Sequence, residues 1–310
     1  MEAIVVFAIS FIVTLCLTPI HIWMFKRIGK VGEDRHKAQR PNVPEMGGIT
    51  IFFGMLISYF ALLHYEGPTW MPYVIASLSI IFFVGIIDDI YAIRQRTKLL
   101  LLMFSAIPLF FYDGGVLDLT VAEFGVGAFY YIAATVGMSA SSNLTNILEG
   151  FNGESIGLGA IASGFLLIDA QILGSIDITW ILLPVFGSLL AFLLFNKYPA
   201  RVFPGDTGTL LIGGSIGLSV IIGGHVVIGV IVLMPQIVEF LLKSRKRFSG
   251  VSYGATKVDG SGYLSPPPYL SVANCLTSRF RLKEYSLVMV IWALGALSGI
   301  LSLMVTYVII

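Results

Sequence analysis

The stretch WMPYVIASLSIIFFVGIIDDIYAIRQRTK, residues 70–98, decides the fold. Residues 70–87 are almost all apolar, and a helix needs about 17–25 such residues to cross the hydrocarbon core of a bilayer. Two adjacent carboxylates, Asp88 and Asp89, follow at once, and a short basic loop comes after them. An apolar helix that ends in a charged loop is typical of a membrane-spanning segment, so this stretch predicts an integral membrane protein.

The composition of the whole chain agrees with that interpretation. Of its 310 residues, 56% are hydrophobic and only 12% are charged, which suits a chain dissolved in lipid. We therefore expect an all-α integral membrane protein with ten spanning helices. Its apolar runs lie at 3–25, 47–65, 70–87, 99–112, 124–142, 155–173, 177–195, 208–222, 225–242 and 286–310. The apolar stretch 208–242 is divided at 223–225 because two helices there keep all Lys and Arg residues on one side of the membrane.

All 19 Lys and Arg residues fall on one side of the membrane in this arrangement, and the opposite loops carry acidic residues only. Lys and Arg collect in cytoplasmic loops, so we expect the basic side to face the cytoplasm and both termini to lie outside. The helices leave little chain for a separate soluble domain, so 1–310 is interpreted as one polytopic domain. Its cytoplasmic segments would be 26–46, 88–98, 143–154, 196–207 and 243–285.

Asp88 and Asp89 place two like charges at the membrane boundary. Such a pair is tolerated most easily when a cation or a metal ion lies beside it. Lys98 follows after a short loop that returns it to the same neighbourhood. The alternative is a polar helix end exposed to water, since helix ends at the interface often carry charge.

A polar insertion, NLTNILEGFNG at 143–153, lies between two apolar runs. Asn146 and Asn152 offer neutral amide oxygens, which suit a hard divalent cation or the edge of a base. Gly150 would let a ligand approach the backbone closely. The alternative is a cap-and-turn sequence that joins two helices.

A third polar element, NKYPARVFPGDTG at 196–208, precedes another apolar run. Asp206 could be an ordinary N-cap of the helix that follows. A helix N-terminus behind a glycine turn also suits a metal-bound diphosphate, and Phe203 offers a flat face for a base. Because three such elements and several cations fall on one face, they predict a site for Mg²⁺ and a polyanionic phosphate substrate beside the lipid.

These motifs resemble the polyprenyl-phosphate N-acetylhexosamine-1-phosphate transferases. The motifs that carry the resemblance are Arg40-Pro41, Pro44-Glu45, Gly47-Gly48, Asp88-Asp89, Lys98, Asn146-Ile147-Leu148, Gly150, Asn152-Gly153, Asn196, Pro199-Ala200-Arg201-Val202-Phe203 and Gly205-Asp206. The resemblance implies transfer of N-acetylglucosamine-1-phosphate from UDP-GlcNAc to a polyprenyl or dolichyl phosphate, with release of UMP. That reaction would be the first membrane step of glycan assembly, and of N-glycan assembly in the dolichyl branch.

The resemblance also implies roles for the residues of the catalytic centre. Asn146 and Asp206 resemble the family's Mg²⁺ ligands, and Lys98 resembles its lysine near the phosphates. Asp88 and Asp89 occupy the family's paired-aspartate position, where the leading proposal is deprotonation or orientation of the lipid phosphate. A phosphate monoester is already mostly dianionic at neutral pH, so Asp88 is expected to position the nucleophile or a metal rather than to act as a strong base.

The same resemblance assigns residues to the nucleotide and to the phosphates. Phe203 resembles the aromatic residue that stacks on uracil, and Gly150 and Asn152 resemble the residues that bind the uridine. Glu45 matches a glutamate of the first cytoplasmic loop that lies near the substrate site.

Arg245 and Arg247 are assigned to the diphosphate by type and position only. The bacterial branches carry a histidine-rich motif in the last large loop, whereas this chain has histidines only at 21, 36, 64 and 225. The chain therefore resembles more closely the archaeal and eukaryotic dolichyl-phosphate branch, which uses an arginine-bearing loop there. The alternative for these cations is contact with lipid headgroups, which the charge pattern of membrane proteins already requires.

The expected reaction is attack of a lipid phosphate oxygen on the β-phosphorus of UDP-GlcNAc, with Mg²⁺, or alternatively Mn²⁺, as cofactor. Direct displacement is favoured over a covalent aspartyl intermediate, although adjacent carboxylates alone do not distinguish the two. Another UDP-sugar remains an alternative, as do two other classes of protein, a membrane transporter and a Mg²⁺-dependent prenyltransferase. No nucleic-acid partner is expected, and a homodimer is an open alternative.

Overall fold

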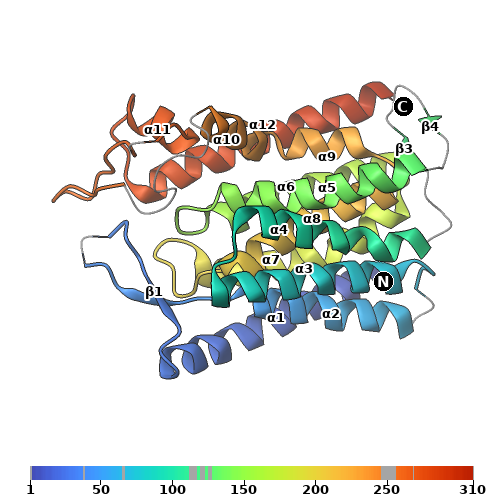
Figure 1. Ribbon diagram of the computed structural model, residues 1–310, viewed down its shortest axis with the longest axis horizontal. Helices are drawn as coiled ribbons and strands as arrows, with labels where there is room; N and C mark the ends of the chain where they lie inside the picture. Colours follow the sequence, from blue (N-terminus) through green and yellow to red (C-terminus); the bar gives the residue numbers. More distant parts are fainter. Residues whose placement is uncertain are drawn as a thin grey trace.

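The computed structural model describes residues 2–37, 39–64, 67–111, 117–118, 123–124, 128–245, 256–267 and 269–309. Figure 1 shows a bundle of long helices that run side by side along one axis. The helices are α1 Glu2–Arg27, α2 Gly48–His64, α3 Met71–Tyr91, α4 Gln95–Met103, the 3₁₀ helix η1 Phe104–Phe111, α5 Ala128–Ile147, α6 Glu154–Leu173, α7 Ile176–Asn196, α8 Gly205–Ile222, α9 Val226–Val232, α10 Met234–Ser244, α11 Val272–Thr277 and α12 Glu284–Ile309.

The described residues of the apolar runs are mostly helical, with Phe124 in β4 as an exception. The expected all-α membrane architecture is confirmed at that level. Six described helices are long and apolar enough to cross a membrane, or seven if α9 and α10 together form one broken span. The other runs form shorter or less apolar helices: 99–112, for example, is divided between α4 and η1. The expected ten spans therefore remain a prediction.

α8 is the central helix of the bundle, and every residue from Thr207 to Ile222 is buried. It packs against α2, α3, α5 and α7. Small residues allow these close approaches: a Cβ at Gly213 would lie 2.0 Å from the Ser141 carbonyl oxygen of α5, and one at Gly48 would lie 2.1 Å from the Gly208 nitrogen. These close contacts therefore fix the position of α8, including its N-terminus, relative to the neighbouring helices.

The polar loops gather at one end of the bundle, called here the polar end, and both chain termini lie at the opposite end (Figure 1). The polar end carries a short antiparallel pair, β1 Val31–Glu33 and β2 Asn42–Pro44, in the register Val31 with Pro44. A second pair, β3 Leu117–Asp118 and β4 Glu123–Phe124, lies at the other end. The two pairs are additions to the expected all-helical fold. Which end faces the cytoplasm stays a prediction.

α9 and α10 are not the single straight helix expected over 225–242. They meet at an angle of 67°, where Leu233 ends one helix and Pro235 opens the next. A proline fits the first turn of a helix but cannot continue a preceding one. The bend turns α10 toward the polar end.

Candidate active site

Asp89 caps the N-terminus of α8 from a neighbouring helix. Its carboxylate accepts hydrogen bonds from the backbone N–H groups of Asp206 and Thr207, at 2.7 and 3.0 Å, and from the Thr207 hydroxyl. α3 comes this close because Gly85 has no side chain: a Cβ there would lie 2.5 Å from the Thr207 Cα. A carboxylate is favoured at a helix N-terminus, where the first N–H groups lack partners. Asp89 therefore fixes the start of α8, and Asp206 with it.

Asp88 has different surroundings, although it is adjacent in sequence. It is 5% exposed, and one carboxylate oxygen accepts the Ile93 N–H at 2.9 Å while the other contacts the Lys98 ammonium. Lys98 also lies 3.2 Å from the carboxylate of Asp206. A buried ammonium between two carboxylates holds them together and partly neutralises them. The short loop thus returns Lys98 to Asp88, as the spacing predicts.

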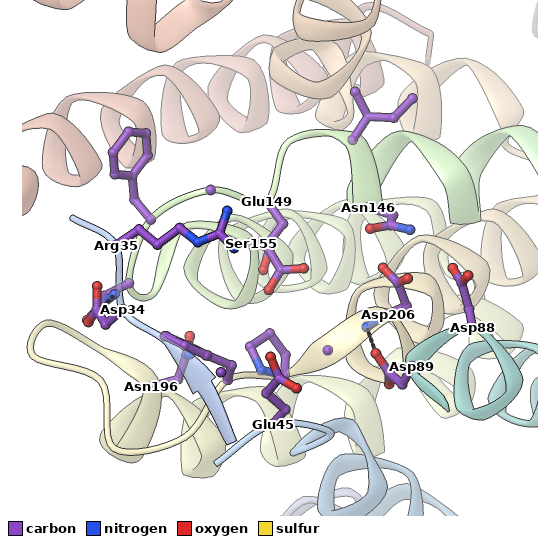
Figure 2. Close-up of a pocket in the computed structure, with 18 of the residues that line it drawn as sticks. Asp34, Arg35, Glu45, Asp88, Asp89, Asn146, Glu149, Ser155, Asn196 and Asp206 are labelled. Atoms are coloured by element: carbon purple, nitrogen blue, oxygen red, sulfur yellow. Dashed lines mark hydrogen bonds between the residues drawn. The ribbon is translucent and has the colours of Figure 1, made fainter. Parts of the chain in front are cut away.

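Asn146, near the end of α5, faces the same cluster. It is 4% exposed, and its Oδ1 has no hydrogen-bond partner among the described residues. Figure 2 shows its side chain directed toward Asp206, with Asp88 close by. An unpaired amide oxygen in a buried position is costly, so this oxygen is available to bind a cation.

Glu149 adds a further carboxylate to this end of the pocket, and the sequence assigned it no role. Burial raises its pKa well above the ordinary value of 4.5, and the negative charges of Asp206 and Asp89 raise it further, while Lys98 opposes them. Glu149 could have been suspected from its place in the polar insertion, three residues after Asn146. The pKa shift therefore reflects first the burial of this carboxyl group and then the carboxylates around it.

The loop that carries Phe203 is hydrogen-bonded to the chain before α2. The Phe203 N–H donates to the Pro44 carbonyl, and its own carbonyl accepts from Gly47, both at 2.8 Å. The Gly48 N–H donates to the Pro204 carbonyl at 2.8 Å. These bonds place the Phe203 ring beside the first polar loop, on the wall of the same pocket.

These elements enclose a pocket of about 600 Å³. Figure 2 shows Asp88, Asp89, Asp206 and Asn146 at one end, and Asp34, Arg35 and Asn196 toward the other. In the described part of the chain, the acidic residues that line it are Glu33, Asp34, Glu45, Asp88, Asp89, Glu149 and Asp206, and the Lys and Arg residues are Arg35 and Lys98. Seven carboxylates against two cations make the pocket a site that favours a divalent cation.

Nine of the eleven residues predicted from the sequence line this pocket: Glu45, Asp88, Asp89, Lys98, Asn146, Gly150, Asn152, Phe203 and Asp206. Arg245 does not. It is exposed at the C-terminal end of α10 and lies outside the pocket lining. Arg247 lies outside the described residues.

Comparison with known proteins agrees with the family resemblance of the sequence motifs. The model of glycosyl transferase family 4 matches residues 71–224. A protein of Saccharolobus solfataricus is 36% identical over 307 residues, covering 95% of this chain and 94% of its own length. It is named as a UDP-N-acetylglucosamine–dolichyl-phosphate N-acetylglucosaminephosphotransferase. The chain belongs to glycosyl transferase family 4.

Two further relatives, one bacterial and one of the genus Sulfolobus, also cover most of this chain. A phospho-N-acetylmuramoyl-pentapeptide-transferase of Halalkalibacterium halodurans is 29% identical, with 77% of this chain and 84% of that protein covered. A Sulfolobus acidocaldarius protein with the same name as the Saccharolobus one is 35% identical and covers 95% of this chain. As a member of glycosyl transferase family 4, the chain is a sugar-phosphate transferase.

The part matched by the glycosyl transferase family 4 model contains both the aspartate pair and Asp206, but the pocket extends beyond it. Asp34, Arg35 and His36 come from the first loop, and Tyr269 comes from the last. Sequence reasoning treated the first of these segments only as part of a basic loop. Burial lowers the pKa of His36 to about 4, so its ring is neutral at physiological pH.

Lys243 has a structural partner instead of facing the pocket. Its ammonium donates to the carbonyl of Ile147 at 2.7 Å and forms an ion pair with Glu239 at 2.9 Å. Glu239 also accepts the Val272 N–H at 2.7 Å. A cation at a helix C-terminus neutralises carbonyls that lack partners, so Lys243 joins α10 to the end of α5 beside Asn146.

Proposed function

We propose that this protein transfers N-acetylglucosamine-1-phosphate from UDP-GlcNAc to a polyprenyl phosphate of the dolichyl type, releasing UMP. The observation that carries the proposal is the unpartnered oxygen of Asn146, buried beside Asp206 and the Asp88–Lys98 pair. The names of the archaeal relatives support the donor and the acceptor. The product would begin a lipid-linked glycan, and an N-glycan is the pathway we propose.

The donor set fits Mg²⁺, and Mn²⁺ equally in kind, because both prefer oxygen ligands. Asn146 and Asp206 would hold the ion, with the Glu149 carboxylate in the same pocket end as a further oxygen donor. When bound, the ion would neutralise diphosphate charge and polarise the phosphorus that is attacked.

The other residues of the cluster would orient and neutralise the reactants. Lys98, already between two carboxylates, would stabilise negative charge on the phosphates as UMP leaves. Asp88 holds Lys98 in place and would orient the lipid phosphate; Asp89 fixes α8 through its backbone bonds. Because the carboxylate of Asp89 is occupied by three donors, we assign it a positioning role.

The acceptor's prenyl chain would lie in a second, apolar pocket of about 250 Å³ between α5, α8, α9 and α10. Its lining is almost wholly apolar, and Leu144, two residues from Asn146, belongs to it. A chain bound there could present its phosphate to the catalytic cluster without leaving the membrane. Occupation by lipid hydrocarbon is favourable at about 0.8 kcal/mol per buried CH₂.

We propose that the polar end faces the cytoplasm, because the basic loops at that end follow the charge rule for cytoplasmic segments. UDP-sugars could then reach the pocket directly. The test is to label single cysteines placed at exposed positions such as Ser278 in the polar end with a membrane-impermeant reagent in intact cells. Labelling only after the membrane is opened supports the orientation, and labelling in intact cells contradicts it.

The reaction is tested with purified protein, a dolichyl or polyprenyl phosphate, Mg²⁺ and a panel of radiolabelled UDP-sugars. Release of UMP together with labelled lipid diphosphate, for GlcNAc above other sugars, is the expected result. Turnover with a different sugar would correct the donor and leave the reaction class intact. Release of inorganic pyrophosphate would indicate a prenyltransferase instead, and uptake of a solute into vesicles without acceptor lipid would indicate a transporter.

A further inference from the structure

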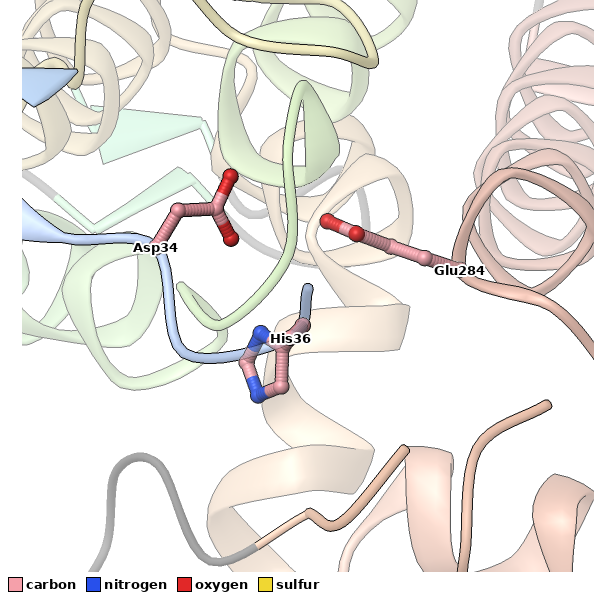
Figure 3. Close-up of side chains that lie close together, drawn as sticks. All are labelled: Asp34, His36 and Glu284. Carbon is pink, nitrogen blue, oxygen red and sulfur yellow. The ribbon is translucent and has the colours of Figure 1, made fainter. Parts of the chain in front are cut away.

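Asp34, His36 and Glu284 form a second cluster, at the other end of the pocket. Their ligand atoms all lie within 4.8 Å of one another, and Figure 3 shows the two carboxylates pointing toward one another from the first loop and from the start of α12. The cluster resembles a metal site, but a cation is already present. The Lys37 ammonium contacts Asp34 and lies 3.7 Å from Glu284, so a metal ion there would meet its charge.

Instead of binding a metal ion, Asp34 and Lys37 fix the side-chain amide of Asn152. Lys37 donates to the Asn152 Oδ1 at 2.7 Å, and the backbone N–H of Ala200 donates to the same oxygen at 2.6 Å. On the other side of the amide, Nδ2 donates to Asp34 at 3.3 Å. Two donors on one side and a carboxylate on the other allow only one orientation of the amide.

A further partner fixes the backbone of the same residue. Glu284 accepts the Asn152 N–H at 2.9 Å and pairs with Lys37 through its other oxygen. Asp34, Asn152 and Glu284 are each no more than 4% exposed. In this dry setting each hydrogen bond strongly opposes rotation of the amide, because a flipped amide would leave buried donors and acceptors unpaired.

The bonds also determine what Asn152 can offer a ligand. An amide oxygen has two lone pairs, and both are used; the amide nitrogen has two hydrogens, and only one is used among the described residues. Asn152 lines the same pocket as Phe203. The Asn152 amide therefore has one N–H donor left for a ligand and no acceptor.

We infer that Asp34, Lys37 and Glu284 act as positioning residues that make the base site selective for uracil over cytosine. The inference rests on the proposed function, which places a uridine nucleotide in this pocket. Uracil carries a carbonyl oxygen at position 4, which accepts from the Asn152 N–H, whereas cytosine carries an amino group that would direct a second donor against it. An amide without these bonds could rotate by about 180° and accept from cytosine, whereas the bonds to Asp34, Lys37 and Ala200 prevent that rotation in Asn152.

The test is the affinity of the purified protein for UMP and CMP, measured by calorimetry without acceptor lipid. The wild type is expected to bind UMP roughly 10- to 100-fold more tightly than CMP, which is the usual penalty for an unpaired buried donor. The decisive variant exchanges the two groups, Asp34→Asn with Asn152→Asp. The carboxylate then at position 152 accepts from Lys37, Ala200 and position 34 and offers the base an acceptor, so the preference should shift toward CMP by at least about tenfold.

Asp259→Asn is the matched control, because it makes the same chemical change at an exposed carboxylate that pairs with Arg281. Its UMP-to-CMP ratio should equal that of the wild type. The double variant Asp34→Leu with Lys37→Met removes two of the three groups that hold the amide. It serves if the exchanged pair fails to fold, and its ratio should fall to below about threefold.

An unchanged ratio in the folded exchanged pair, or in the Asp34→Leu and Lys37→Met double variant, would overturn the positioning role while UMP binding upheld the proposed function. A wild type that binds UMP and CMP equally would overturn it as well. Binding of neither nucleotide would contradict the proposed function itself.

Discussion

Two buried sites in the bundle contain carboxylates, and they differ in how completely their hydrogen-bonding groups are satisfied. In α6, Asp169 accepts the Ser302 and Thr306 hydroxyls of α12 at 2.8 and 2.7 Å, one on each oxygen, and all three residues are fully buried. At the polar end, several carboxylates share Lys98, and the Asn146 oxygen has no partner among the described residues.

This difference indicates that Asp169 contributes to helix packing, whereas the residues of the polar end contribute to function. Buried polar groups inside a membrane are costly unless they are paired, and Asp169 is paired by its neighbouring helix, so it needs nothing else. The Asn146 oxygen has no such partner among the described residues, and the proposed metal ion would supply one. The two sites therefore predict opposite responses to mutation, a loss of stability at Asp169 and a loss of catalysis at Asp206.

The largest expected effect comes from Asp206→Ala, which removes a charged ligand of the proposed metal site. Transfer activity should fall at least about 1000-fold, the upper range for loss of one electrostatic contact with a transition state. Sugar-phosphate transfer to lipid is measured beside a thermal unfolding curve. Activity within tenfold of wild type would contradict the role given to this cluster.

The next largest effect is expected for Lys98→Met. It removes the ammonium that contacts Asp88 and Asp206, so turnover should fall about 100-fold, and stability should also fall because buried carboxylates lose their partner. Lys257→Met removes an exposed charge and should change neither. A variant at Lys98 that lost stability but kept its turnover per folded molecule would make this residue structural only.

Gly85→Ala tests whether the contact between α3 and α8 positions the site. The new Cβ would lie 2.5 Å from the Thr207 Cα, so the helices must separate, at a cost of about 1–3 kcal/mol of stability. Gly164→Ala on α6 is the control, since its Cβ would meet no atom closer than the edge of the Phe186 ring at 3.3 Å. Chemical denaturation and transfer activity are measured on both, and equal losses in the two variants would contradict the positioning role.

Asp169→Ala should affect stability and leave catalysis unchanged. Interhelical hydrogen bonds in membranes contribute about 0.6 kcal/mol each on average, so the loss of two should destabilise the protein by about 1 kcal/mol. Unfolding in mixed micelles gives the free energy, and the turnover number of the folded enzyme should stay at the wild-type value. A large loss of turnover would make Asp169 part of the function and remove the contrast between the two sites.

The smallest effect concerns Glu45, in the loop before α2. Burial raises its pKa above the ordinary value of 4.5, and nearby Asp89 adds to the shift while Lys30 opposes it. The folded state then binds this proton more tightly than the unfolded state, so the free energy of unfolding falls as pH rises above 4.5 and through the folded-state pKa. Glu45→Gln should reduce that slope and stabilise the protein at neutral pH. An identical slope in the variant would show that Glu45 does not contribute.

The sequence predicted the membrane class and most of the pocket, because both follow from local patterns. Apolar runs bounded by charge become helices, and polar insertions between them meet at one end of the bundle. Asp88 and Asp89, however, could not be told apart from their positions in the sequence. The structure shows that Asp89 caps α8, because Gly85 lets α3 approach α8 closely, and that Asp88 contacts Lys98. Lys243 and Arg245 likewise lie two residues apart in one basic stretch of the sequence, yet Lys243 pairs with Glu239 and Arg245 is exposed.

Residues whose roles depend on long-range contacts were the ones that sequence reasoning missed. Glu149 is a carboxyl group in the loop after α5, and its surroundings include Asp89 and Asp206, which are far from it along the chain. Asp34 and Glu284 come from opposite ends of the sequence and meet only through Lys37 and Asn152. No periodicity or spacing contains that information.

The most direct test of the contrast is a titration of the purified protein with Mn²⁺, followed by electron paramagnetic resonance in the presence of UDP. We expect one tightly bound ion per chain in the wild type and in Asp169→Asn, and its loss in Asn146→Leu and in Asp206→Ala. Equal binding in all four proteins, or loss of the ion in Asp169→Asn alone, would contradict the assignment of the unsatisfied cluster as the metal site.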